Sequence, residues 1–290
     1  MSYPEAPFLF KNLFALGSVN LLAGMSGGGK SRFNFQLLEE IEQRSTLLGF
    51  PSLIPISTTY FAFDRPLSSV HKTLNTMGCT LRTPLVSAFD QSRTYEELTL
   101  PKPDQLRGYQ LAIFDGLDCL VPKLSDSREV GRLLFQCTKL AQKSNCTILA
   151  ILGTAKVKEG EGYSHPRERI IGSTFWGRLS DDIILISSKD DPSEPMGRII
   201  SILPRNAPEF NLDMIFQNGR LIRTLMLNPE SDEMKLYSLL PVAFTTSEAQ
   251  SLASTLGLSR ATLFRYLTRL TDQQLIKQAE KGSYLKVTVN

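Results

Sequence analysis

The chain has 290 residues, of which 42% are hydrophobic and 21% are charged, a composition typical of a globular protein with a sizeable core. Its formal net charge is only +3, so any nucleic-acid-binding surface must be local. Four widely spaced cysteines and two histidines exclude a Cys/His metal centre. The N-terminus lacks the features of a secretory signal, and no uncharged apolar run approaches the ~20 residues of a membrane span. We therefore expect a soluble, cytoplasmic protein without a membrane partner.

Short apolar runs alternate with helical patterns through the first half of the chain. Residues 19–23 predict a buried strand, and residues 30–44 carry apolar side chains at helical spacing. Further strands are expected at 58–64, 85–90, 109–115 and 146–152, with helices at 67–78 and 127–143. This alternation predicts an α/β fold with a mostly parallel central sheet that helices cover on both faces.

The second half of the chain differs in character. Residues 153–177 are rich in glycine and charge and are expected to form a long functional loop. A polar stretch with a proline, 228–234, is interpreted as a linker between a first domain at 1–227 and a second domain at 235–290. The second domain should contain three short helices and a hairpin, whereas the first should end with strands at 181–187, 198–204 and 212–223.

The stretch "GMSGGGKS", residues 24–31, matches the pattern G-x-x-x-x-G-K-[ST] between a predicted strand and a predicted helix, the context that a P-loop requires. Glycines let backbone N–H groups turn toward an anion, and the helix adds its positive N-terminal end. Lys30 would reach the β- and γ-phosphates of ATP, and the Ser31 hydroxyl would hold Mg²⁺. The expected nucleotide-binding residues are Gly24, Met25, Ser26, Gly27, Gly28, Gly29, Lys30, Ser31 and Arg32.

Two acidic residues that follow apolar strands are candidates to complete this site. In "LAIFD", four apolar residues precede Asp115, a pattern typical of the second carboxylate that supports the metal ion. Hydrolysis also needs a group that orients or deprotonates the attacking water, and Asp64, at the end of "TYFAFD", is the candidate. The alternative role for Asp64 is to cap the helix that begins near Pro66.

At this point the chain resembles a family, the RecA-like P-loop ATPases of the RepA type, which are hexameric replicative helicases of plasmids and phages. The resemblance covers residues 15–225 and rests on "GMSGGGKS", "LAIFD" and three weaker stretches. "YFAFDRP" is similar to the family's strand–Glu–Asp–Pro pattern, "CTILAILGTAK" to a strand leading to His-His-x-x-Lys, and "IIGSTFWG" to an Arg-Gly-Ser-Ser stretch. The resemblance implies a RecA-like core, ATP and Mg²⁺ as cofactors, a hexameric ring and DNA as partner.

Several family residues are replaced in this chain. The family's Glu corresponds to Asp64, and its strand-end histidines correspond to Leu152 and Gly153. The arginine before Gly-Ser is Ile171, whereas Lys156 matches the lysine of the histidine motif and is an expected DNA contact.

A further replacement affects the expected ring interface. Related hexameric helicases carry a Lys-x-Arg pair that reaches the nucleotide of the neighbouring subunit. In "ILPRNAP" the lysine position holds Leu203, and the arginine is kept as Arg205. The resemblance therefore implies that Arg205 completes the ATP site in trans, with weaker or altered coupling to DNA. The alternative is that Arg205 is an ordinary surface arginine.

Residues 235–290 resemble a winged helix–turn–helix domain. Ser259 is a good N-cap for a helix on which Leu263, Leu267 and Leu270 share one face. Residues on this helix that are expected to contact DNA phosphates and base edges are Arg260, Thr262, Arg265 and Arg269. Because such domains also dock proteins or stabilise rings, a protein-binding role remains the alternative.

The sequence thus favours one function over two others. The leading hypothesis is an ATP-hydrolysing, DNA-binding ring, a helicase-like protein in the replication of a plasmid, phage or other mobile element. The second is an ATP-switched DNA-binding or recruitment factor that does not unwind DNA, which the replaced histidine and lysine positions favour. The third is a protein-interaction scaffold with a vestigial ATP site. Replication or recombination proteins are further expected partners.

Overall fold

The computed structural model describes residues 7–10, 12–25, 27–92, 94–154, 170, 174–189, 196–217, 220–223, 232–272, 275–280 and 282–286. The chain divides into two compact units, Met1–Thr224 and Leu225–Asn290. Among the helices of the described residues, none has the length and apolar character needed to cross a lipid bilayer.

A nine-stranded sheet runs through the described residues of the first unit, in the order β13-β12-β11-β10-β3-β9-β8-β6-β7. The strands β10, β3, β9, β8, β6 and β7 are parallel, and β11, β12 and β13 extend the sheet in antiparallel fashion. Their bounds are β3 Val19–Gly24, β6 Thr58–Ala62, β7 Leu85–Ser87, β8 Leu111–Asp115, β9 Thr147–Gly153, β10 Ile183–Ser188, β11 Gly197–Leu203, β12 Phe210–Gln217 and β13 Arg220–Arg223. The expected mostly parallel sheet is confirmed.

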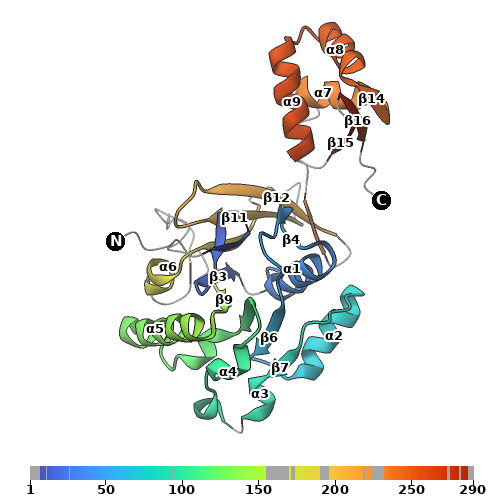
Figure 1. Ribbon diagram of the computed structural model, residues 1–290. Coiled ribbons are helices and arrows are strands. Elements are labelled where there is room, and N and C mark those ends of the chain that lie inside the picture. Colours follow the sequence, from blue (N-terminus) through green and yellow to red (C-terminus); the bar gives the residue numbers. More distant parts are fainter. Residues whose placement is uncertain are drawn as a thin grey trace. The chain divides into compact units, whose positions relative to one another are not determined.

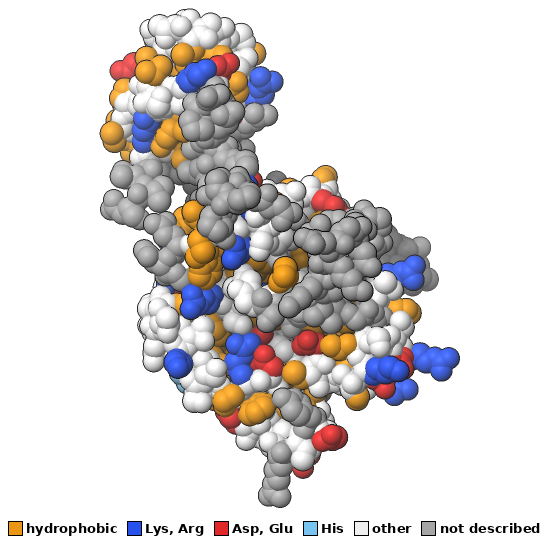
Figure 2. Space-filling view, turned by 180° about the vertical axis from the view of Figure 1, so that it is seen from behind, with side chains coloured by type: hydrophobic (Ala, Val, Ile, Leu, Met, Phe, Trp, Pro, Cys, Tyr) orange, Lys and Arg blue, Asp and Glu red, His pale blue; other side chains and the backbone are white. Residues whose placement is uncertain are grey.

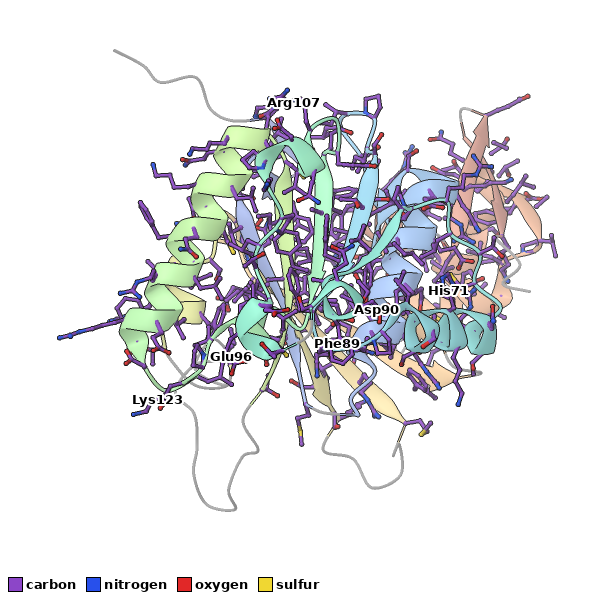
Figure 3. The ribbon with its side chains drawn as sticks, turned by 90° about the horizontal axis from the view of Figure 1, so that it is seen from below. His71, Phe89, Asp90, Glu96, Arg107 and Lys123 are labelled. Atoms are coloured by element: carbon purple, nitrogen blue, oxygen red, sulfur yellow. The ribbon has the colours of Figure 1, made fainter. Side chains whose placement is uncertain are left out.

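Helices cover both faces of this sheet (Figures 1 and 3). One core packs α1 (Lys30–Arg44) and α2 (Leu67–Met77) on one face, and a second core packs α5 (Ser127–Ser144) and α6 (Phe175–Leu179) on the other. The buried strands supply alternate residues to the two cores: in β8, Ile113 faces the first core and Phe114 the second. Because both faces are buried, these strands are continuous apolar runs in the sequence.

Small elements connect these layers in the first unit. The stretch expected to be a strand at 85–90 is strand only to Ser87, whose hydroxyl accepts a hydrogen bond from the Asp90 N–H at 2.8 Å and caps a short helix, α3. That part of the prediction was wrong because Ser87, within the apolar run, caps a helix and so ends the strand. The other small elements are β1 Phe8–Phe10, β2 Leu13–Ala15, β4 Thr46–Leu47, β5 Phe50–Pro51, α3 Ala88–Gln91, α4 Pro103–Leu106 and the 3₁₀ turns η1 Tyr95–Glu97 and η2 Leu117–Leu120.

The described residues of the second unit contain three helices and a three-stranded antiparallel sheet, ordered β14-β16-β15. Their bounds are α7 Asp232–Leu239, β14 Ala243–Thr245, α8 Thr246–Thr255, α9 Arg260–Asp272, β15 Ile276–Glu280 and β16 Ser283–Lys286. Leu263, Leu267 and Leu270 of α9 are buried in the unit's core, as their shared face predicts. The Ser259 hydroxyl accepts from the Thr262 N–H at 3.1 Å, as expected of an N-cap.

The boundary between the units differs in detail from the expected linker. Helix α7 begins at Asp232, so the last three residues of 228–234 are helical, and 228–231 lie outside the described residues. Asp232 and Glu233 lie in the first turn, where negative side chains interact favourably with the helix dipole. The polar residues that suggested a linker therefore include the first turn of a helix.

Candidate nucleotide-binding site

The P-loop stretch lies at the carboxyl end of β3, the central strand of the nine-stranded sheet. Gly24 pairs with Ile186 of β10 and Gly153 of β9, and the loop leads directly into α1 at Lys30. Gly29 has a φ of 91°, a conformation that glycine adopts without steric cost. A Cβ atom at Gly29 would also lie 3.2 Å from the Phe216 ring. Of the nine predicted loop residues, Ser26 lies outside the described residues.

Lys30 folds back over the loop that precedes it. Its Nζ donates hydrogen bonds to the carbonyl oxygens of Gly24 at 2.8 Å and Met25 at 3.0 Å. Burial lowers the pKa of Lys30, while the charges of Asp115 and Asp118 act in the opposite direction. The arrangement holds a cation at the loop, where the phosphates of a nucleotide would meet it.

Asp115 ends β8 and is almost fully buried, with 2% of the residue exposed. One carboxylate oxygen, Oδ2, has three neighbours: the Tyr60 hydroxyl donates to it at 2.6 Å, the Ser31 hydroxyl lies at 3.4 Å, and the Arg65 guanidinium lies at 3.3 Å. Burial raises the pKa of Asp115, and Arg65, the Tyr60 hydrogen bond and Lys30 act against this rise. A nearby cation stabilises the ionised form of a buried carboxylate of this kind.

The residues expected to hold Mg²⁺ fit that ion. Ligands in adjacent positions of an octahedral Mg²⁺ are about 3 Å apart, because each lies about 2.1 Å from the metal. The Ser31 and Asp115 oxygens are 3.4 Å apart and are both hard oxygen donors. When bound, the ion would neutralise part of the negative charge of the phosphates.

Asp64 lies at the same edge of the sheet, two residues after β6 ends at Ala62. Its carboxylate accepts two hydrogen bonds from Arg65, 2.8 Å from Nε and 2.9 Å from Nη2. Asp64 also packs against the main chain that follows Asp115, where a Cβ added to Gly116 would lie 2.6 Å from the Asp64 Cβ. The two carboxylates are therefore brought to one place by neighbouring strands.

The capping role considered for Asp64 is wrong. Helix α2 has Pro66 at its N-cap position without a side-chain hydrogen bond. Instead, the Asp90 carboxylate accepts from the Leu67 N–H at 2.9 Å, and Figure 3 shows Asp90 beside the start of this helix. Asp64 is consequently left to face the cleft.

These residues surround one cleft of about 850 Å³, a volume suited to a nucleotide. Figure 2 shows one face of the first unit, on which acidic and basic side chains lie next to one another. Sequence reasoning missed several contributors, including Tyr60, which it placed only within the strand expected at 58–64. Phe216 was also missed because β12 is distant in sequence, yet the centroid of its ring lies 5.5 Å from the Arg32 guanidinium. Other lining residues that it missed are Arg65, Thr73 and Asp118.

Arg205 lies at the opposite edge of the sheet from the P-loop. Leu203, at the end of β11, pairs with the first residue of β10, whereas Gly24 pairs with Ile186 further along β10. A six-residue strand such as β3 spans roughly 20 Å, so Arg205 is far from the P-loop of its own chain. Its side chain, 47% exposed, pairs with Asp181 at 3.1 Å, and its N–H donates to Asp182 at 3.0 Å.

The remaining predicted contacts lie partly outside the described residues. This holds for Lys156 and for the side chain of Arg269. On α9, Arg260 and Arg265 are exposed and lie over aromatic rings, 5.7 Å from the centroid of Phe264 and 5.9 Å from that of Tyr266. Thr262 is half-buried, with its hydroxyl 3.0 Å from that of Ser259.

No family model and no curated protein matches this chain. Solved structures do resemble it. One of them, an ATPase domain, matches with a TM-score of 0.52 and 11% identity, over 71% of this chain and 84% of that chain. The KaiC-like protein PH0186 from the hyperthermophilic archaeon Pyrococcus horikoshii OT3 matches with a TM-score of 0.51 and 12% identity, over 74% and 93% of the two chains. Such likeness shows the fold: the first unit has the α/β fold of RecA-like P-loop ATPases.

The Tyr60 hydrogen bond generates a prediction about pH. Because this bond favours the ionised form of Asp115, Tyr60→Phe should raise the pKa of that carboxyl further. The ionised carboxylate, which is present above the pKa, is the form that would hold Mg²⁺. As the pH is lowered, the variant should therefore lose Mg²⁺-dependent nucleotide binding at a higher pH than wild type. Calorimetric titrations with Mg²⁺-ATP across a pH series measure this shift. Tyr109→Phe, outside the cleft, is the control, and superimposable pH profiles for all three proteins would refute the prediction.

Proposed function

We propose that the chain is a Mg²⁺-dependent ATPase that works as a DNA-bound ring, a helicase-like protein in the replication of a plasmid, phage or other mobile element. The observation that carries the ATPase part is the convergence of Lys30, Ser31, Asp64 and Asp115 on one cleft at the end of the parallel strands. The RecA-like fold supports the same class of chemistry by analogy.

Each of these residues has a separate role in the proposed hydrolysis. Lys30 and the loop amides would hold the β- and γ-phosphates, and Ser31 and Asp115 would hold the metal ion. Asp64 accepts a hydrogen bond from the attacking water and receives its proton, which then passes to solvent. The water oxygen bonds to the γ-phosphorus as the bond to the β–γ bridging oxygen breaks, and the products are ADP and phosphate.

Lys30→Ala and Asp115→Asn should each lower kcat by about 100-fold or more, because each removes charge stabilisation from the transferred phosphoryl group. Phosphate release is measured with and without single- and double-stranded DNA, and DNA should stimulate the wild-type chain. Lys72→Ala, on the exposed surface of α2, is the matched control and should retain full turnover. Equal turnover by Lys30→Ala and wild type would support the scaffold hypothesis instead.

We place Arg205 at the interface between ring subunits. Its position across the sheet from its own P-loop supports a role in trans, since it lies roughly 20 Å from the loop in its own chain. In this role the side chain would exchange its ion pair with Asp181, at 3.1 Å, for the phosphates of a neighbouring subunit. A head-to-tail ring repeats this contact at every interface.

Mixing two inactive variants tests this role. Arg205→Ala keeps its P-loop, and Lys30→Ala keeps its arginine, so an equal mixture should restore about a quarter of the sites, where one subunit of each kind meets the other. ATPase activity of the mixture is compared with that of each variant. A mixture of Lys30→Ala with Asp115→Asn is the control, because both changes damage the same half of the site. Persistent inactivity of the first mixture would argue against Arg205 in trans.

We propose that the second unit is a winged helix that binds DNA through α9. The exposed guanidinium groups of Arg260 and Arg265 support this role, because phosphate contacts of this type supply most of the affinity of DNA-binding modules. The apolar side of α9 is already used in the core of the unit. Its exposed side is therefore the one available to a partner.

The double variant Arg260→Ala/Arg265→Ala should weaken DNA binding. It should also make the negative slope of log K against log salt less steep by about 2, one for each lost phosphate contact. Fluorescence anisotropy with labelled duplex at several salt concentrations measures both quantities. Lys235→Ala, an exposed lysine on α7 of the same unit, should leave them unchanged. DNA affinity that is unaffected by the double change would favour protein docking as the role of this unit.

A DNA-binding switch without unwinding is the second candidate function. Leu152 and Gly153 line the cleft at the positions where the RepA-type family has histidines, and neither has a side chain that can hydrogen-bond to a phosphate or to DNA. Strand displacement on a forked duplex separates the two functions, because a switch binds the fork and hydrolyses ATP without displacing a strand.

A further inference from the structure

The side chain of Arg65 contacts both carboxylates on which the proposed hydrolysis depends. Its Nε and Nη2 donate to Asp64 at 2.8 and 2.9 Å, and Nη2 lies 3.3 Å from Oδ2 of Asp115. The same Asp115 oxygen is the one that faces Ser31. One guanidinium group therefore bridges the water-orienting and metal-holding residues.

This position is defined by packing as well as by charge. Only 25% of the Arg65 side chain is exposed, and the Ser87 hydroxyl donates to the Arg65 carbonyl oxygen at 3.2 Å. Burial lowers the pKa of Arg65, but the hydrogen bond with Asp64 and the charge of Asp115 together raise it above its ordinary value. Arg65 is therefore a permanent cation in the wall of the cleft.

Two cations thus converge on this cleft from different elements. Lys30 comes from the first turn of α1, and Arg65 from the segment between β6 and α2. They are close enough for the charge of Arg65 to lower the pKa of Lys30. Two cations this close repel each other, which destabilises the fold unless anions lie nearby. In the free chain three aspartates of the cleft, Asp64, Asp115 and Asp118, supply the negative charge.

One nitrogen of Arg65 is left for a ligand. Among the hydrogen bonds of the described residues, those that the Arg65 guanidinium group donates come from Nε and Nη2, and Nη1 takes part in none of them. A guanidinium group can hold one carboxylate through two nitrogens and still donate to a second anion, because its five N–H bonds point in fixed directions. If Asp115 held a metal ion, the ion would compensate the charge of this carboxylate, and Arg65 could then exchange it for another anion.

We propose that Arg65 recognises the γ-phosphate of ATP from within the same subunit: it keeps its two hydrogen bonds to Asp64 and exchanges Asp115 for a γ-phosphate oxygen. This inference rests on the proposed ATPase function and deepens it. It makes Arg65 a specificity-determining residue that distinguishes ATP from ADP, and it places Asp64 beside the phosphorus that the water attacks.

Nucleotide binding without turnover tests the inference. Dissociation constants are measured by calorimetry for Mg²⁺-ADP and for a non-hydrolysable ATP analogue, with wild type, Arg65→Ala, Arg65→Lys and the control Arg107→Ala. Arg107 is exposed and lies outside the cleft (Figure 3). A lost charge-assisted hydrogen bond corresponds to roughly tenfold or more in affinity.

We expect Arg65→Ala to bind the ATP analogue at least about tenfold more weakly than wild type, with ADP affinity within about twofold of wild type. The affinity of Arg65→Lys for the ATP analogue should lie between those of wild type and Arg65→Ala, since lysine keeps the positive charge but lacks the paired N–H groups of a guanidinium. Unchanged ADP binding also shows that the site is still folded. Equal losses for both nucleotides, or no loss for either, would overturn the inference and leave the ATPase proposal standing. A wild-type chain that binds neither nucleotide would overturn both.

Discussion

The burial of one carboxylate organises the site of this protein. Asp115 ends a central strand that helices cover on both faces, so its charge is taken out of water and must be compensated by neighbours. Tyr60, Ser31 and Arg65 supply that compensation from β6, α1 and the segment after β6, with Lys30 acting at longer range. Every one of these elements reaches Asp115 because parallel strands bring their carboxyl ends to the same edge of the sheet.

The same constraint separates the two halves of the expected catalytic apparatus. Residues that follow parallel strands, such as Asp64 and Asp115, meet at the P-loop edge. Arg205 follows an antiparallel strand and therefore lies at the other edge, where Asp182 holds its main chain at 3.0 Å. A single subunit cannot bring these groups together, which is the physical basis for proposing an assembly in which one copy completes the site of the next.

Particular residues show how far sequence reasoning reached. The strand before the glycine-rich loop and the apolar strand that ends at Asp115 lie where the sequence predicted them, since a buried strand is a local pattern. Asp64 remained ambiguous because a carboxylate after a strand can cap a helix or face a cleft, and only the contact between Asp90 and Leu67 decides between them. The strand expected at 85–90 and the linker expected at 228–234 were misjudged where capping and first-turn residues begin short helices.

The amino-acid sequence by itself determined the order of strands and helices, the parallel sheet and the glycine-rich loop with the P-loop pattern, because each depends on periodicity or on glycine at fixed spacing. The tertiary structure alone decided which side chains surround that loop. No motif assigned a role to Tyr60, Arg65 or Phe216, although "YFAFDRP" contains the first two. Their roles arise from the register of β6 and β12 against their neighbours and from the burial of Asp115. Distances between residues far apart in the chain are set by packing, which no local pattern encodes.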